Sequence, residues 1–252
     1  MTTRPRPSLS VTLITLNAAA QLEGCLESVR FAAEIVVLDA GSTDATREIA
    51  ARCGARVIEG PWLGFGRQKQ AAVEAASKDW VLCLDADERV SSELRLAIEA
   101  ALQAGTHTAW RMARANRFMG RILRHGEGYP DWSVRLFDRR HARWSDDPVH
   151  EKVLAEGLVG TLAGDLLHES AESLDAYLTK QNRYTTLQAE RMHAGGERAG
   201  WARVVVSPVV RFIKFYFVRL GFLDGVPGLV HISIGCFNSM MKYAKLRAMA
   251  GK

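Results

Sequence analysis

The sequence predicts an α/β fold with a mostly parallel sheet and a helical extension at its C-terminus. Within residues 9–102, apolar runs of strand length alternate with segments in which apolar residues recur every three to four positions. Strands and helices that alternate in this way form right-handed βαβ units with parallel strands. The strands show almost no polar alternation, which is expected where helices cover both faces of a sheet.

The predicted elements can be placed by their apolar patterns and end signals. Strands are expected at residues 9–16, 34–39, 56–59 and 80–84. Helices are expected at residues 20–29, 43–53, 66–77 and 91–102, the last one capped by Ser91 or Ser92. From about residue 106 the pattern changes to short strands at 109–113, 133–137, 151–154 and 162–167, followed by a long helix at 173–193.

The composition is that of a folded chain with a substantial core. The 252 residues are 48% hydrophobic and 24% charged, which excludes a largely disordered protein. The net charge is +5, and bases dominate residues 111–143 and recur over 198–252. Such stretches can meet phosphates on nucleic acid, on lipid headgroups or on a phosphorylated acceptor, or they can be solvated surface. None of the four cysteines stands in a CxxC pair, so neither a zinc knuckle nor a thioredoxin-like site is indicated.

Polar residues follow three of the predicted strands. In a parallel α/β sheet the ligand binds beyond the C-terminal ends of the strands. Asn17, Asp39 and Asp85 all fall at such ends, so we expect them to lie along one edge of the sheet.

Two acidic clusters carry the chemistry that the sequence predicts. In the first, at residues 39–44, Asp39 can accept hydrogen bonds from a base or a ribose, although the same residues are typical of a turn that caps a helix. In the second, at residues 85–88, Asp85 and Asp87 stand one residue apart and can approach one cation. Such oxygen ligands suit Mg²⁺ or Mn²⁺, and a cation there would bridge a diphosphate. The alternative is a solvated acidic loop.

The segments around these clusters resemble the family 2 glycosyltransferases, which have the nucleotide-diphospho-sugar transferase (GT-A) fold. The resemblance rests on residues 11–17, 35–46 and 80–88. It implies a Rossmann-like GT-A fold that binds a UDP-sugar, with a nucleotide site that includes Thr15, Asn17 and Asp39. It also implies that Asp85 contacts the ribose or the sugar and that Asp87 ligates the metal ion.

Two further segments, at residues 64–70 and 129–137, are similar to the subfamily that glucosylates the heptose of the lipopolysaccharide inner core. This similarity implies that Lys69 lies near the nucleotide. In the acceptor site we expect Trp132 to stack on a sugar and Arg135 to hold a phosphate, although core packing explains Trp132 nearly as well.

An inverting transfer needs a base that deprotonates the acceptor hydroxyl. Glu151 is the candidate, with Asp146 or Asp147 behind it, and similar proteins carry Val-His-Glu at this point. The alternative is that Glu151 only starts a strand.

His168 follows an apolar strand. In related metal-dependent transferases a histidine near this position completes the metal shell, so His168 is the second expected metal ligand, although a lone histidine is more often structural.

These features divide the chain into three predicted parts and lead to one predicted activity. The parts are a nucleotide-sugar-binding half at 1–105, an acceptor-binding half at 106–198 and an amphipathic helical segment at 199–252.

The Gln-x-x-Arg-Trp signature of processive polymerases is absent, so we expect transfer of a single hexose, from UDP-glucose, to an inner-core heptose on lipid A-core. No residue distinguishes glucose from galactose. The alternatives are a polyprenyl-phosphate glycosyltransferase, which needs no base, and a non-catalytic membrane-bound scaffold that keeps the GT-A fold.

The C-terminal segment combines apolar residues with regularly spaced bases. Arg211, Lys214 and Arg219 fall on one side of a helix predicted over 204–223. No charge-free stretch reaches the roughly 18 to 20 residues that span a bilayer, so we expect an interfacial helix pair on an anionic membrane, or a helix buried against its own domain or a dimer partner. With no secretion signal, we expect a cytoplasmic protein, peripheral on the inner face of the inner membrane and without a nucleic-acid partner.

Overall fold

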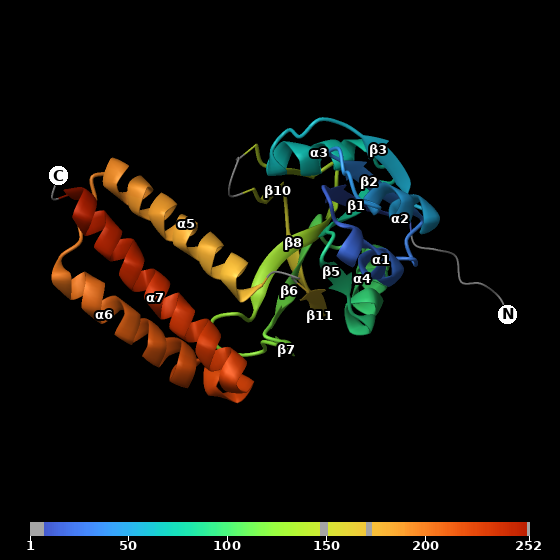
Figure 1. Ribbon diagram of the computed structural model, residues 1–252. Coiled ribbons are helices and arrows are strands. Elements are labelled where there is room, and N and C mark those ends of the chain that lie inside the picture. Colours follow the sequence, from blue (N-terminus) through green and yellow to red (C-terminus); the bar gives the residue numbers. More distant parts are fainter. Residues whose placement is uncertain (1–7, 147–150, 170–172, 251–252) are drawn as a thin grey trace. The chain divides into compact units, whose positions relative to one another are not determined.

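The computed structural model describes residues 8–146, 151–169 and 173–250, which form two compact units (Figure 1). The first unit comprises Met1–Arg114 and Asp131–Glu169, and the second comprises Ala115–Pro130 and Ser170–Lys252. Strand β6 (Ala109–Phe118) begins in the first unit and ends in the second. The boundaries predicted after residues 105 and 198 concern functional halves, and they stay a prediction.

The first unit is built on a sheet whose parallel half comes first in the chain. The strand order is β3-β2-β1-β4-β8-β6-β11-β5. Parallel pairing joins β1 (Leu9–Thr15), β2 (Glu34–Asp39), β3 (Arg56–Glu59) and β4 (Trp80–Asp85). The helices of this half are α1 (Ala19–Ser28), α2 (Thr46–Arg52), α3 (Phe65–Ala75) and α4 (Ser92–Ala104). The predicted alternation of strands and helices is therefore confirmed.

The second half of the sheet is antiparallel. Strand β8 (Asp131–Asp138) pairs with both β4 and β6, and β11 (Val159–His168) pairs with β5 (Glu88–Val90). A separate two-stranded sheet joins β9 (Ala142–Trp144) to β10 (Val153–Ala155). Strand β5 was not predicted, and it begins at Glu88, the last residue of the second acidic cluster.

Helix ends in the first unit follow from local hydrogen bonds. The side chain of Ser91 accepts a hydrogen bond from the amide of Leu94 at 3.2 Å, so Ser91 caps α4 as predicted. Helix α2 begins later than residue 43, because Asp44 accepts a hydrogen bond from the amide of Thr46 at 3.0 Å and holds the preceding residues in a turn. Helix α1 buries Leu22, Cys25 and Leu26 in the core, which is the face that its periodicity predicted.

The second unit is a group of helices arranged around α7 (Gly225–Ala250). Helix α7 packs along α5 (Leu174–Ala194) and α6 (Trp201–Phe212), as Figure 1 shows. A π-helical turn, η1 (Ile213–Val218), and a 3₁₀ turn, η2 (Gly221–Asp224), connect α6 to α7. The short strand β7 (Arg121–Ile122) pairs with the end of β6.

The helix predicted over 204–223 is broken after η1. Leu220 adopts a φ of 55°, and a Cβ on Gly221 would lie 2.3 Å from Cδ1 of Ile232, so only glycine allows this close packing. In the part of the chain that is described, no helix alone has the length and hydropathy to cross a membrane. The pair Trp201–Val218 and Gly221–Ala250, bent by 74°, meets that criterion only when taken together.

The bases of the α6 region do not all face solvent. Arg211 forms an ion pair with Glu127, and the guanidinium of Arg219 donates to the carbonyl oxygen of Tyr129 at 3.2 Å. The expectation that Arg211, Lys214 and Arg219 form one free basic side therefore needs correction. Of these three, Lys214 and Arg219 are exposed, and the ammonium of Lys214 lies 5.3 Å from the ring centre of Phe215.

Candidate active site

Strand register brings the predicted nucleotide residues to one edge of the sheet. Thr15, the last residue of β1, lies opposite Asp39, the last residue of β2. Ile14 lies opposite Asp85, the last residue of β4. Because all three strands run in parallel, their carboxyl ends form a common edge, where ligands bind in folds of this type.

Asp39 is fully buried, and neighbouring residues at the same edge of the sheet donate hydrogen bonds to its carboxylate. Its carboxylate accepts from the hydroxyl of Thr15 at 2.8 Å, from the amide and hydroxyl of Ser42 at 2.7 and 2.6 Å, and from the amide of Gly41 at 3.1 Å. Burial raises the pKa of Asp39, but the hydrogen bonds outweigh it, and the net shift is downward. The carboxylate is therefore ionised and fixed in place.

Asn17 joins the ends of β1 and β2. It adopts a φ of 52°, its amide donates to the hydroxyl of Ser42 at 2.8 Å, and its side-chain oxygen accepts from the amide of Thr43 at 2.9 Å. The described contacts of Asn17 thus shape the loop of the first acidic cluster. A direct contact with the nucleotide stays a prediction.

Asp85 lies between two cations. Its Oδ1 is 3.1 Å from Nζ of Lys69, which projects from α3, and its Oδ2 is 2.7 Å from Nη2 of Arg135, which projects from β8. Burial raises the pKa of Asp85, but the charges of Arg135 and Lys69 outweigh it and hold the pKa well below its usual range. A carboxylate has about four lone-pair positions, so Asp85 can still accept a hydroxyl of a ribose or sugar.

Glu88 is the functional residue that the sequence did not reveal. It is fully buried at the start of β5, with Oε1 2.7 Å from Nη2 of Arg135 and Oε2 accepting from the amide of Asp85 at 2.9 Å. Burial raises the pKa of Glu88, and the charge of Asp85 adds to this rise while Arg135 opposes it. The only available signal was its place after Asp85 and Asp87, which fits a loop equally well.

The position of Arg135 differs from the one expected for an acceptor-binding residue. The side chain is buried, 5% exposed, and bridges Asp85 and Glu88. These carboxylates shift its pKa upward against the opposing effect of burial, so the guanidinium is permanently charged. Arg135 therefore stabilises the second acidic cluster from inside the protein, and these contacts do not support a phosphate-binding role.

Lys69 connects the donor side of the site to the candidate base. Its Nζ lies 3.1 Å from Oδ1 of Asp85 and 3.1 Å from Oε1 of Glu151. The ammonium also lies 4.8 Å from the ring centre of Trp144, which is buried in β9. The sequence did not single out Trp144, because its packing partners are far away in the chain.

Of the two substitutes for Glu151, Asp146 is less well placed. Asp146 is 69% exposed at its side chain and lies 4.0 Å from Arg67. Asp147 lies outside the described residues. Glu151 itself precedes β10, and its side chain is 18% exposed.

Asp87 and His168 meet where β5 pairs with β11. His168 is opposite Glu88 in the strand register, and its Nε2 lies 3.0 Å from Oδ2 of Asp87. Burial raises the pKa of Asp87, but the hydrogen bond and charge of His168 outweigh it, and the net shift is downward. Both side chains are partly exposed, at 29% for Asp87 and 21% for His168.

This pair fits a metal site that a substrate completes. Among the described residues, no group of three or more His, Cys, Asp or Glu side chains is arranged to hold a metal ion. A site for Mg²⁺ or Mn²⁺ needs only one or two protein ligands when phosphate oxygens and water supply the rest. A carboxylate and an imidazole that already converge are therefore a suitable, though incomplete, ligand set.

The remaining acceptor candidates have partners within the first unit. Trp132 is 46% exposed on β8, and the guanidinium carbon of Arg111 lies 4.9 Å from its ring centre. Arg139 and Arg140, in the basic stretch 111–143, also bond within the chain, to backbone carbonyls of α3 and to Asp138. Arg139 and Arg140 therefore have structural contacts. A sugar that stacks on Trp132 would have to use the part of the ring that the guanidinium of Arg111 does not cover.

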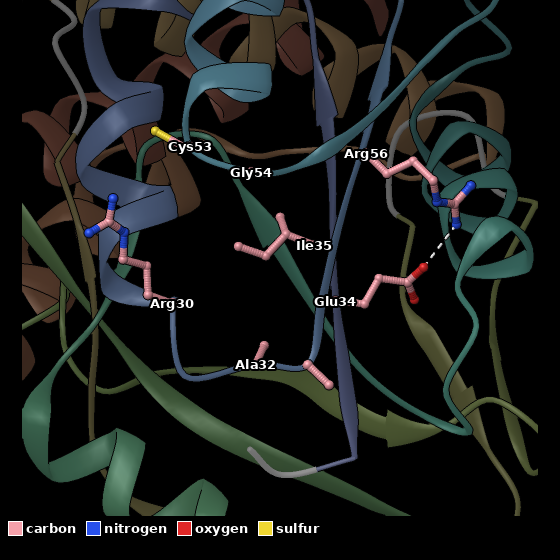
Figure 2. A pocket seen from close by; sticks show the side chains of 8 residues that line it. Arg30, Ala32, Glu34, Ile35, Cys53, Gly54 and Arg56 are labelled. Atoms are coloured by element: carbon pink, nitrogen blue, oxygen red, sulfur yellow. Dashed lines mark hydrogen bonds and ion pairs between the residues drawn. The ribbon is translucent and has the colours of Figure 1, made fainter. Parts of the chain in front are cut away.

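A pocket at the other ends of the strands carries none of this chemistry. Figure 2 shows that it is lined by Arg30, Ile35 and Cys53 and by the ion pair of Arg56 with Glu34. Glu34 and Arg56 are the first residues of β2 and β3, whereas Asp39 ends β2. The candidate active site therefore lies at the opposite edge of the sheet.

Comparison with known proteins decides the family. The family model described as glycosyl transferase family 2 matches residues 10–153. The chain belongs to this glycosyltransferase family. It is 32% identical over 250 residues to the lipopolysaccharide core biosynthesis glycosyltransferase LpsC of Rhizobium meliloti (strain 1021), covering 96% of this chain and 93% of LpsC. It is also 30% identical to an uncharacterised glycosyltransferase of Rickettsia prowazekii (strain Madrid E), over 97% of this chain and 88% of that protein.

A solved structure supports the fold of this family 2 enzyme. The mannosyltransferase PcManGT from Pyrobaculum calidifontis, solved with GDP-Man and Mn²⁺, matches with a TM-score of 0.54 at 16% identity, covering 97% of this chain and 87% of that chain. The GT-A fold and the resemblance to lipopolysaccharide core transferases are thereby confirmed. The roles of individual residues stay predictions.

Proposed function

We propose that this glycosyltransferase is an inverting, metal-dependent enzyme that adds one glucose from UDP-glucose to a heptose of the lipopolysaccharide inner core. The similarity to LpsC, which extends over nearly the whole chain, supports a core lipopolysaccharide acceptor. The observation that carries the chemistry is the position of Lys69 Nζ, 3.1 Å from both Asp85 and Glu151. Through these two ion pairs, Lys69 connects Asp85, at the expected nucleotide edge, with Glu151, which would act on the acceptor.

On the donor side, the nucleotide would lie across the ends of β1, β2 and β4. Asp85 is an ionised acceptor there, suited to a hydroxyl group of a ribose or sugar. Asp39 already accepts four hydrogen bonds, so a contact with the nucleoside would require it to exchange one of them. Asp87 and His168 would hold the divalent ion beside the diphosphate. When bound, that ion neutralises charge on the leaving UDP. A mannosyltransferase of the same fold binds GDP-Man and Mn²⁺, which is consistent with this arrangement.

On the acceptor side, Glu151 would take the proton from the attacking hydroxyl. The attack comes from the face opposite the leaving nucleotide, so the configuration at the anomeric carbon inverts. The ion pair with Lys69 keeps the Glu151 carboxylate oriented while the acceptor binds. Lys69 therefore acts as a positioning residue for both substrates.

A transfer assay tests this proposal. Purified full-length protein would be incubated with Mn²⁺, lipid A-core truncated at its heptose, and either UDP-glucose, UDP-galactose or GDP-mannose. We expect acceptor-dependent UDP release with UDP-glucose, a mass increase of one hexose, and a product linkage opposite to the α-configuration of the donor. Product with several added hexoses, retained configuration, or transfer to polyprenyl phosphate instead of the core lipid would contradict it.

A further inference from the structure

The second unit exposes a continuous set of large apolar side chains along α6 and η1. Eight of them are at least half exposed: Trp201, Val205, Val206, Val209, Val210, Ile213, Phe217 and Val218. Monomeric soluble proteins rarely leave apolar patches of this extent uncovered unless the patch binds something.

The exposed residues of α6 form one face of the helix. Successive residues on a helix differ by about 100°, so Trp201, Val205 and Val209 follow each other along one line with a drift of about 40° per step. The opposite face packs on α7, where Val204 is buried and the hydroxyl of Ser207 lies 2.8 Å from that of Ser239. The apolar face is thus not needed for packing within the second unit.

The apolar surface continues beyond the end of α6. In the turns and at the start of α7, the exposed large apolar residues are Leu220, Phe222, Leu223, Val226 and Leu229. Both sides of the break between η1 and η2 therefore present apolar side chains.

The charged residues of the segment that carries this surface are almost all basic. Residues 198–252 contain nine bases and a single acid, Asp224. Asp224 is 2% exposed and accepts hydrogen bonds from the amides of Arg124 and His125 at 3.0 and 2.8 Å. Arg203 forms an ion pair with the exposed Glu197 at 3.7 Å. The exposed charges of η1 and the residue after it come from the bases Lys214 and Arg219. A second copy of the chain would bring like charges together, whereas an anionic bilayer would attract them.

We infer that the apolar face of α6, with η1, η2 and the start of α7, docks onto an anionic lipid bilayer. Amphipathic helices that combine apolar burial with basic flanks bind such surfaces without spanning them. The inference goes beyond the proposed sugar transfer, since docking needs neither donor nor metal ion.

Vesicle flotation without substrates tests the docking surface. The full-length protein would be mixed with vesicles of phosphatidylglycerol and phosphatidylethanolamine, or of phosphatidylcholine alone. We expect at least about tenfold tighter binding to the anionic vesicles, weakened by salt. The double variant Val205→Ser, Val209→Ser should lose at least about tenfold, because two apolar contacts with the bilayer are removed.

Matched variants make the result decisive. Leu96 is 65% exposed on α4 in the first unit, so Leu96→Ser should bind like the wild type. Lys214→Gln should weaken binding to anionic vesicles several-fold. Equal losses from Leu96→Ser, no preference for anionic vesicles, or self-association abolished by the Val205 and Val209 changes without vesicle binding would overturn the inference. Vesicle binding by a protein that transfers no sugar would overturn only the proposed function.

Discussion

Nε2 of His168 lies 3.0 Å from Oδ2 of Asp87, although the two residues are 81 positions apart. The antiparallel register of β5 and β11 sets this distance, because it places His168 opposite Glu88, the neighbour of Asp87. Asp87 lies two residues beyond Asp85, the last residue of β4. The convergence of this nitrogen and this oxygen is the basis of the metal-dependent mechanism proposed above.

His168→Ala should weaken the affinity for the metal ion without unfolding the protein. We expect the Mn²⁺ concentration for half-maximal UDP release to rise at least about tenfold, since one of two protein ligands is lost. Manganese titration of the transfer reaction measures this. His141, which is exposed in a turn of the first unit, provides the matched control His141→Ala, and an equal shift in both variants would refute a ligand role.

Arg135→Met should destabilise the first unit strongly. Removing the guanidinium leaves the fully buried Glu88 and the partly exposed Asp85 without their common partner, which costs about 3–5 kcal/mol in the free energy of unfolding. Glu88→Gln should cost less, about 1–2 kcal/mol, because burial already raises the pKa of Glu88 and so opposes its charged form.

Urea unfolding of these variants gives the comparison. The exposed pair of Arg30 with Glu27 supplies the control, and Arg30→Met should change the free energy of unfolding by less than about 0.5 kcal/mol. If Arg135→Met were as stable as Arg30→Met, the bridge between the two carboxylates would not contribute as described.

Glu151→Gln should lower kcat while leaving the donor KM nearly unchanged. Loss of a general base reduces the rate by about 10²–10⁴-fold, because the acceptor hydroxyl must then attack without proton transfer. Steady-state assays with the truncated core lipid measure the effect, with the exposed Glu156→Gln as control. Unchanged turnover would instead favour an acceptor that is already an anion, such as polyprenyl phosphate.

Glu34 should stabilise the fold in a pH-dependent way. Burial raises its pKa, but hydrogen bonds from Ser10 and Ser77 and from Arg56 outweigh it and lower the pKa to about 2 (Figure 2). A carboxyl group with a depressed folded pKa stabilises the protein above its ordinary pKa of about 4.3, and this contribution is lost as the pH falls toward 2.

Glu34→Gln should therefore lose about 1–2 kcal/mol at pH 7, after allowance for solvent screening. The difference from the wild type should shrink between about pH 4.3 and pH 2. Chemical unfolding across this range measures it, and a constant difference at all pH values would show that the charge of Glu34 is not the cause.

The strand ends of the site could be predicted because they depend on local patterns. Apolar runs followed by Asp39 and by Asp85 show where parallel strands stop, and parallel strands stop at one edge. The predicted helix cap at Ser91 was equally local. For these residues, sequence neighbours alone determine the structure.

The contacts inside the site could not be predicted because they join distant segments. Arg135 contacts Asp85 and Glu88, which are 50 and 47 positions away in the chain. The spacing of apolar residues along a sequence does not indicate which distant residues will pair. A strand as short as β5, Glu88–Val90, has too few residues for an alternating pattern. The break at Leu220 was hidden by the continuous apolar run of the predicted helix, and it depends on Gly221 packing against Ile232.

Calorimetry of UDP binding with Mn²⁺, on the wild type and on Asp87→Asn, tests the central claim most directly. We expect the wild type to bind UDP at least about tenfold more tightly with Mn²⁺ than with a chelator, and Asp87→Asn to lose most of that difference. Equal UDP affinity for the two proteins in Mn²⁺, or wild-type affinity that persists in chelator, would contradict a metal ion held by Asp87 beside the diphosphate.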